Sequence, residues 1–195
     1  MSVRDGAADT GKNAHLLCEE FERGKLDVFK FDEAVVQRAK PYLDWYDENV
    51  EKTYFVEKPV FSRTLFAGGT PDGGFLMKDG RNLINDKKFK NSIFDPKPHW
   101  QMAAYRMMLE EMAQDTTTPV RLELDSGVEE YKNPQEYLGS IGGLKWDGSV
   151  ILLLPPTEKE KEPEIKPIYR YAYEEDKNSF MAAVTIYRAL QAYKS

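Results

Sequence analysis

The sequence predicts a single α/β domain, in which helices and β-strands alternate along the chain. Stretches whose apolar side chains recur at helical spacing are separated by short runs rich in β-branched and aromatic residues. The chain of 195 residues is long enough to bury one hydrophobic core, and no segment rich in Pro, Gly or Ser divides it. We therefore expect one domain that spans residues 1–195.

The composition excludes several classes of protein. Hydrophobic residues make up 41% of the chain and charged residues 31%, which argues against wholesale disorder, a collagen-like repeat and a coiled coil. The longest apolar run, Val150 to Pro156, is far shorter than the roughly 18 residues that a membrane span needs, and it predicts a buried strand. Residues 1–13 lack the apolar stretch of a secretory signal, and Cys18 is the single cysteine. We therefore expect a cytoplasmic protein without membrane association.

The N-terminal part of the chain predicts two helices. Apolar residues recur at helical spacing between residues 10 and 23, and Gly24 offers a stop for this first helix. Asp32 can cap a second helix that ends before Asn49. Because Pro41 lies within its pattern, we expect this helix to form two pieces or to be kinked.

Three runs rich in β-branched and aromatic residues follow, and they predict a three-stranded meander. They extend from Thr53 to Phe61, from Thr64 to Met77 and from Asn82 to Phe89. The Lys78-Asp79-Gly80 sequence supplies a tight hairpin connection between the last two. The Gly68-Gly69 pair predicts a bulge or a close approach of the backbone to another group.

The second half of the chain predicts helices and strands in alternation. Pro96 and Pro98 introduce a helix over about residues 99–114. A Gly-rich loop is expected at 139–148, and a solvated turn at the acidic and basic run 158–164. The remaining expected elements are strands at Val120–Leu124, Ser149–Leu154 and Pro167–Tyr173 and an amphipathic helix at 176–193.

Three charged residues of the expected meander are candidates for catalysis. Asp72 falls on its second strand, while Asp86 and Lys88 lie two apart on the third, so the last two side chains share one face. The hairpin would bring Asp72 beside them. Carboxylates bind hard divalent cations such as Mg²⁺, which polarise a phosphate and lower the pKa of a bound water. Lys88 could orient or deprotonate that water, and the trio therefore suits phosphodiester hydrolysis.

The order of the motifs resembles a known family of nucleases. Residues 70–72 (TPD) followed by Asp86-Lys87-Lys88 are similar to the PD…(D/E)xK signature, and 101–105 (QMAAY) is similar to the QxxxY motif of RecB-type exonucleases. Upstream, 11–19 (GKNAHLLCE) resembles the GxxxHxxxE element of the same branch. The chain thus resembles the PD-(D/E)xK nuclease superfamily, in its RecB-like exonuclease branch, from about residue 10 to the last helix.

This resemblance implies a fold and a metal site. The fold would be a PD-(D/E)xK restriction-endonuclease-like core, with a central mixed β-sheet flanked by helices. His15, Asp72 and Asp86 would bind Mg²⁺ or Mn²⁺ together with the main-chain carbonyl of Lys87. Lys88 would be the lysine that activates water.

The resemblance also implies how DNA would be bound. Gln101 and Tyr105, one helical turn apart, would position the DNA backbone or end near the scissile phosphate. Lys90 is a further candidate for contact with the substrate, because it lies in a basic segment, 78–97, that holds six basic and three acidic residues. The whole chain carries a net charge of −6, so we expect DNA to approach from one side.

The implied function is that of a metal-dependent DNA exonuclease in replication, recombination or repair. Such an enzyme would act with partner proteins of these processes. The small size of the chain is compatible with a phage or mobile-element origin. Glu57 and Glu19 are weaker candidates for a second metal or for support of the ligands. Only 14 residues precede His15, so we expect a DNA-end clamp to be reduced or supplied by another subunit. One cysteine argues against the iron–sulfur relatives.

Two alternatives stay open at this point: an endonuclease with the same fold, and a non-catalytic DNA-binding protein on the same scaffold. Taken singly, Asp72 after a proline is typical of a turn, and His15 among apolar neighbours is typical of a structural residue. The conjunction of four motifs in order favours the nuclease interpretation.

Overall fold

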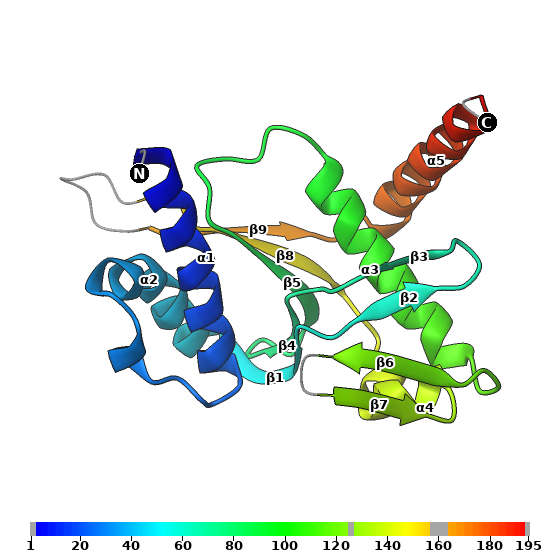
Figure 1. The fold of residues 1–195 in the computed structure, drawn as a ribbon, viewed down its shortest axis with the longest axis horizontal. Helices are drawn as coiled ribbons and strands as arrows, with labels where there is room; N and C mark the ends of the chain where they lie inside the picture. Colours follow the sequence, from blue (N-terminus) through cyan, green and yellow to red (C-terminus); the bar gives the residue numbers. More distant parts are fainter. Residues whose placement is uncertain (1–2, 125–126, 157–163, 194–195) are drawn as a thin grey trace.

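The computed structural model describes residues 3–124, 127–156 and 164–193 (Figure 1). Within these residues, five strands form a central mixed sheet in the order β1-β4-β5-β8-β9, flanked by helices. This arrangement confirms the predicted α/β class. The strands of this sheet are β1 (Val50–Val56), β4 (Gly73–Met77), β5 (Asn82–Lys88), β8 (Gly148–Leu153) and β9 (Lys166–Arg170).

The pairing of β5 with β8 makes the sheet mixed. Neighbours β1, β4 and β5 run antiparallel, as the predicted meander requires. β5 and β8 run parallel, with Asp86 opposite Ile151 and Lys88 opposite Leu153, and β9 then pairs antiparallel with β8. A parallel pair needs a long crossover connection, and α3 (Lys97–Gln114) lies within it.

Two of the predicted strands are each broken, which corrects the sequence analysis. The run from Thr53 to Phe61 forms β1 and then β2 (Val60–Ser62), and the run from Thr64 to Met77 forms β3 (Ala67–Gly69) and then β4. β2 and β3 pair with each other as a separate hairpin beside α3 (Figure 1). The first break falls at Glu57, whose φ of 49° lies in the left-handed region and ends the extended conformation.

Two helices, α1 (Val3–Glu22) and α2 (Glu33–Asn49), pack together on one face of the sheet. The stop predicted at Gly24 is confirmed, because this residue has a φ of 66° directly after α1. α2 continues through Pro41 as one helix, so the two-piece alternative is wrong; the buried apolar face of α2 holds it together across the missing N–H. Asp32 occupies the N-cap position of α2 but makes no capping hydrogen bond with its side chain.

The two faces of the sheet carry separate hydrophobic cores because strand side chains alternate. Leu83 on β5 packs toward α1 and α2, whereas its neighbour Ile84 packs toward α3. The same alternation sends Asp86 and Lys88 to the α3 side and Lys87 to the α1 and α2 side. One strand thus supplies charged groups to both faces.

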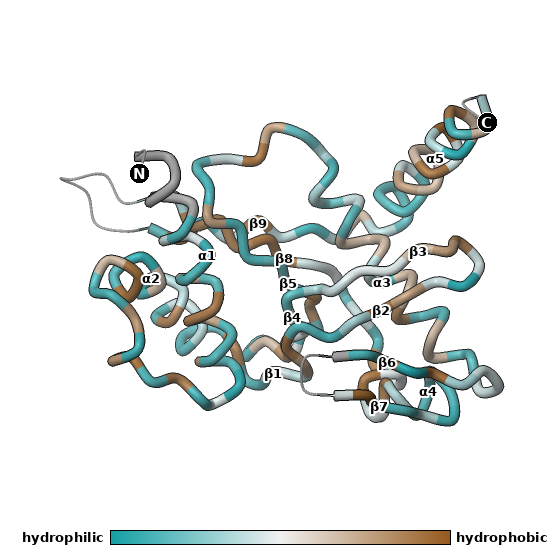
Figure 2. Tube along the Cα trace, viewed as in Figure 1, coloured by the Kyte–Doolittle hydropathy of each residue, from teal (hydrophilic) through white to brown (hydrophobic). Residues whose placement is uncertain are grey.

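The last helix, α5 (Tyr173–Ala192), packs on α3 and projects away from the sheet (Figure 1). It confirms the predicted C-terminal helix but begins earlier, so β9 ends at Arg170 and the strand predicted to reach Tyr173 is too long. Ile186 and Leu190 are exposed along it. Figure 2 shows hydrophobic segments in brown along α5. No helix formed by the described residues combines the length and apolar character that crossing a membrane requires.

The sequence does not predict two elements on the crossover between α3 and β8. These are the strand β7 (Gly127–Tyr131), which pairs with the predicted strand β6 (Val120–Leu124), and the short helix α4 (Pro134–Leu138). The Gly-rich passage begins with a short 3-10 helix at Gly139–Gly143. Of the turn expected at 158–164, only Glu164 lies within the described residues.

Candidate metal centre

Asp72 is held at the entrance to β4 rather than on the strand, which corrects the sequence analysis. β4 begins at Gly73, and Asp72 forms a bend directly before it. The carbonyl of Asp72 accepts a hydrogen bond from the Glu57 N–H at 2.9 Å. Its Oδ2 atom accepts another from the main-chain N–H of Lys87 at 2.6 Å. These bonds fix the carboxylate between the end of β1 and the end of β5.

His15 reaches the same carboxylate from the middle of α1. Its Nε2 atom lies 3.0 Å from Oδ2 of Asp72 and 3.7 Å from Oε1 of Glu57. One potential ligand atom from each of these three residues lies within 4.8 Å of the others. The two carboxylates suit Mg²⁺ or Mn²⁺, and the imidazole adds a nitrogen ligand that favours a transition metal such as Mn²⁺.

The electrostatics of the His15–Asp72 pair are those of an ion pair. The hydrogen bond to Asp72 raises the pKa of His15 more than burial lowers it. Burial alone would raise the pKa of Asp72, but the hydrogen bond from His15 and the charge of Lys87 outweigh it, and the pKa is lowered. A divalent cation could take the position of the proton that His15 shares with Asp72.

Glu57 completes this group, and the structure supports it as a candidate metal ligand more strongly than the sequence does. Its Oε1 atom is buried and has no hydrogen-bond partner among the described residues. Burial, together with the charge of Asp72, raises the pKa of Glu57 to about 7, against the opposing effect of His15. A carboxylate oxygen that is buried without a hydrogen-bonding partner, on a residue with left-handed backbone, is costly to the fold, and such costs are typical of a binding site.

Asp86 and Lys88 extend from β5 on the α3 side of the sheet, as their spacing predicts. The Lys88 ammonium donates to Oδ1 of Asp86 at 2.8 Å. Oδ2 of Asp86 is buried and has no hydrogen-bond partner in the described part of the chain. Burial and the charge of Asp72 raise the pKa of Asp86 to about 6, although Lys88 opposes the rise. Asp86 is not part of the close group formed by His15, Glu57 and Asp72.

Lys87 lies between these two residues but points to the opposite face. Its Nζ atom lies 2.5 Å from Oε1 of Glu22 on α1, and both side chains are fully buried. The same Glu22 oxygen accepts a hydrogen bond from the Tyr42 hydroxyl at 2.6 Å. Burial would lower the pKa of Lys87, but the charges of Glu22 and Asp72 outweigh it and raise the pKa. The Lys87 side chain therefore links β5 to α1, while the Lys87 main-chain N–H holds the Asp72 carboxylate.

Gln101 and Tyr105 lie on α3 beside the same end of β5. Nε2 of Gln101 donates to the Tyr105 hydroxyl at 2.9 Å. Burial and the charges of the two aspartates raise the pKa of Tyr105 to about 12, so its hydroxyl stays protonated at neutral pH. Gly69 permits the close approach expected of it, because a Cβ atom there would lie 2.6 Å from Cε1 of Tyr105. Lys88, Gln101 and Tyr105 line one cleft of about 610 Å³.

Two sequence candidates stand apart from this arrangement. Lys90 is exposed in the loop after β5, and its main-chain N–H donates to the carbonyl of Lys88 at 2.9 Å. Glu19 on α1 pairs at 2.8 Å with Arg23, the residue that follows this helix, and lies outside the group of His15, Glu57 and Asp72.

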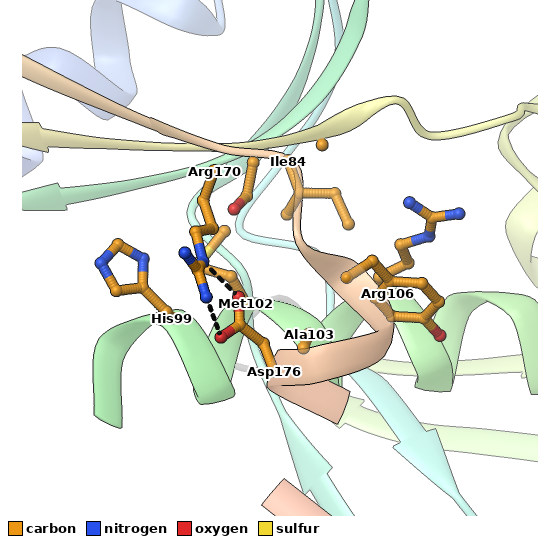
Figure 3. A pocket seen from close by; sticks show the side chains of 10 residues that line it. Ile84, His99, Met102, Ala103, Arg106, Arg170 and Asp176 are labelled. Carbon is orange, nitrogen blue, oxygen red and sulfur yellow. Dashed lines mark hydrogen bonds and ion pairs between the residues drawn. The ribbon is translucent and has the colours of Figure 1, made fainter. Parts of the chain in front are cut away.

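A second pocket, on the other side of α3, has a structural explanation (Figure 3). There the guanidinium of Arg170 on β9 donates to both oxygens of Asp176 on α5, at 2.7 and 2.9 Å. His99 lies beside this ion pair, and burial lowers its pKa. The ion pair fastens the start of α5 to the sheet and takes no part in the metal centre.

Comparisons with known proteins add no family assignment. No family model matches the sequence, and no curated protein matches it. The function is therefore inferred from the motifs and from the geometry of the residues themselves.

Proposed function

We propose that the protein is a Mg²⁺- or Mn²⁺-dependent DNA exonuclease with a PD-(D/E)xK restriction-endonuclease-like core. One observation carries the proposal. A group of His15, Glu57 and Asp72, whose ligand atoms lie within 4.8 Å of one another, adjoins the Asp86–Lys88 pair on β5. The motifs that suggest a nuclease in the sequence are far apart along the chain, and the fold gathers them.

The ligand set fits a divalent cation on chemical grounds. Glu57 and Asp86 each bury an oxygen without a hydrogen-bonding partner among the described residues, and both have raised pKa values. A cation would compensate these charges. When bound, such an ion polarises a phosphate oxygen and lowers the pKa of a coordinated water. The main-chain carbonyl of Lys87 as a further ligand stays a prediction of the resemblance.

The other residues act on the substrate. The Lys88 ammonium lines the cleft and would offset negative charge that develops on the phosphate in the transition state. The Tyr105 hydroxyl accepts a hydrogen bond from Gln101 and keeps its own proton, which it can donate to a phosphate oxygen. These two α3 residues would fix the position of the DNA backbone relative to the metal ligands.

The test is a cleavage assay with end-labelled linear DNA and a closed circular control, each in Mg²⁺, in Mn²⁺ and in EDTA. We expect metal-dependent loss of the linear DNA alone, with cleavage abolished in Asp86→Asn. Asp79→Asn is the matched control, because Asp79 is an exposed carboxylate in the turn between β4 and β5, paired with Arg81. It should cleave at the wild-type rate.

Three outcomes would contradict the proposal. Cleavage of the circle would indicate an endonuclease instead. Tight binding of DNA in Mg²⁺ without turnover would favour a non-catalytic DNA-binding protein, and full activity of the Asp86→Asn protein would show that the assigned residues are not the active site.

A further inference from the structure

The cleft beside the candidate active site is larger than the catalytic residues need. It has a volume of about 610 Å³, within the range of sites that bind small molecules. Lys88, Gln101 and Tyr105 line it together with residues of β3, the start of α3 and α5. In Figure 1, β3 and α5 lie near α3, at the right of the view. A substrate held at the catalytic residues would therefore extend into this cleft.

The rest of the lining is largely apolar and includes two aromatic rings. Trp100 on α3 and Phe180 on α5 both line the cleft and are both partly exposed. The other two tryptophans, Trp45 and Trp146, are 7% and 2% exposed and belong to the hydrophobic cores. Aromatic side chains that remain accessible in a cleft offer flat surfaces on which nucleobases stack.

The charges of the cleft suit an anion beside such a ring. Lys88 and Lys97 both line it. The third charged residue, Asp95, accepts a hydrogen bond from the main-chain N–H of Lys97 at 2.9 Å, so its carboxylate is engaged with the start of α3. An occupant that combines a flat, largely apolar ring with a phosphate matches this lining, and a nucleotide has both groups.

We propose that the cleft holds the unpaired terminal nucleotide of a DNA strand, with its base against Trp100 and Phe180 and its phosphate near Lys88. The inference rests on the proposed nuclease function and names its substrate class: DNA with a single-stranded end. A paired terminal base is stacked and hydrogen-bonded within the duplex, so it must first unpair and unstack before it can enter the cleft.

The experiment measures binding separately from cleavage. Asp86→Asn protein in Mg²⁺ is titrated with fluorescein-labelled oligonucleotides, one single-stranded and one a blunt-ended hairpin, and the dissociation constants are compared. In a second series, 2-aminopurine replaces either the terminal or an internal base. We expect tighter binding of the single strand, and quenching of 2-aminopurine that is strongest at the terminal position.

Variants then identify the surface. Trp100→Ala and Phe180→Ala should each weaken binding of the single strand by roughly tenfold or more, as loss of one stacking partner does. Trp100→Phe should retain most of the affinity. Tyr187→Ala is the matched control, because Tyr187 is an aromatic residue of the same helix as Phe180, 63% exposed and outside the cleft lining. It should bind like its parent.

The proposal is overturned if Trp100→Ala and Phe180→Ala bind as well as Tyr187→Ala, if blunt and single-stranded DNA bind equally, or if no DNA binds. Failure of the proposed function has a different signature. If wild-type protein cleaves no DNA in Mg²⁺ but the terminal base is still quenched, the cleft binds nucleotides and the nuclease assignment is wrong. If cleavage depends on Asp86 but the stacking variants bind normally, only the cleft assignment is wrong.

Discussion

Replacement of Asp86 by asparagine should stabilise the metal-free protein while it abolishes cleavage. Asparagine keeps the shape of the side chain and the oxygen that accepts from Lys88 at 2.8 Å. Burial and the charge of Asp72 raise the pKa of Asp86 from 3.8 to about 6. A group whose pKa rises on folding stabilises the fold while it is protonated. This contribution is complete below the pKa that the group has in the unfolded chain, and it is lost as the pH rises through the pKa in the folded protein. At pH 8 the ionised, buried carboxylate therefore opposes folding.

The size of this effect follows from the two pKa values. Each pKa unit corresponds to ~1.4 kcal/mol, so ionised Asp86 destabilises the metal-free protein by about 3 kcal/mol at pH 8. By the same relation, the destabilisation by Asp86 is about half as large at pH 5 and is small near pH 4. The side chain is only 4% exposed, so solvent screens the effect weakly. For a domain of this size, the midpoint of thermal unfolding should rise by roughly 6–12 °C in Asp86→Asn at pH 8.

The assay is thermal and urea unfolding in EDTA between pH 5 and pH 8. Asp176→Asn is the control of opposite sign, because Asp176 is equally buried but accepts two hydrogen bonds from Arg170, and it should lose stability. Addition of Mg²⁺ at pH 8 should stabilise the wild type and leave Asp86→Asn nearly unchanged. An Asp86→Asn protein that is less stable than the wild type at pH 8, or a difference that does not vary with pH, would refute the reasoning.

Three further substitutions test separate parts of the site. Lys88→Met should lower single-turnover cleavage by about 10²- to 10⁴-fold while Mg²⁺ still raises the melting temperature; loss of both would show that Lys88 supports metal binding instead. Glu22→Gln leaves the buried Lys87 ammonium without its carboxylate and should destabilise the protein by about 3–5 kcal/mol in urea unfolding, and a change under ~1 kcal/mol would contradict a tight pair. Gly69→Ala places a Cβ atom 2.6 Å from the ring of Tyr105, so cleavage should fall with metal-induced stabilisation unchanged, and wild-type cleavage would show that Tyr105 needs no exact placement.

The sequence predicts the fold class because most elements depend on local periodicity. The helices at both ends and the buried strand β8 follow directly from the spacing of apolar residues. The break at Glu57 does not, because a single left-handed residue leaves no mark on a pattern of β-branched and aromatic side chains. β7 is missed for a related reason: four of its five residues are exposed, so burial imposes no alternation on Gly127–Tyr131.

The candidate site could be predicted where its residues follow the order of a motif. The two-residue spacing of Asp86 and Lys88 on one strand is enough to place them together. Glu57 gains its significance only from the fold, because the turn after β1 is what carries it to Asp72 and His15. The signal in the sequence was a glutamate just before a Lys-Pro pair at the end of a strand, and such a pattern also fits an ordinary surface turn.

Helix α1 is attached to the candidate site at two points, through His15 to Asp72 and through Glu22 to Lys87. These residues lie about 10 Å apart along the helix axis. His15 contacts the Asp72 carboxylate, which accepts the Lys87 N–H, and Glu22 contacts the Lys87 side chain, so both contacts converge on Lys87 of β5. The helix therefore acts as a rigid spacer. A displacement along its axis would move the imidazole away from the metal ligands and pull on Lys87 at the same time. A molecule that binds the exposed side of α1 and displaces the helix along its axis would therefore alter the metal centre without contact with it.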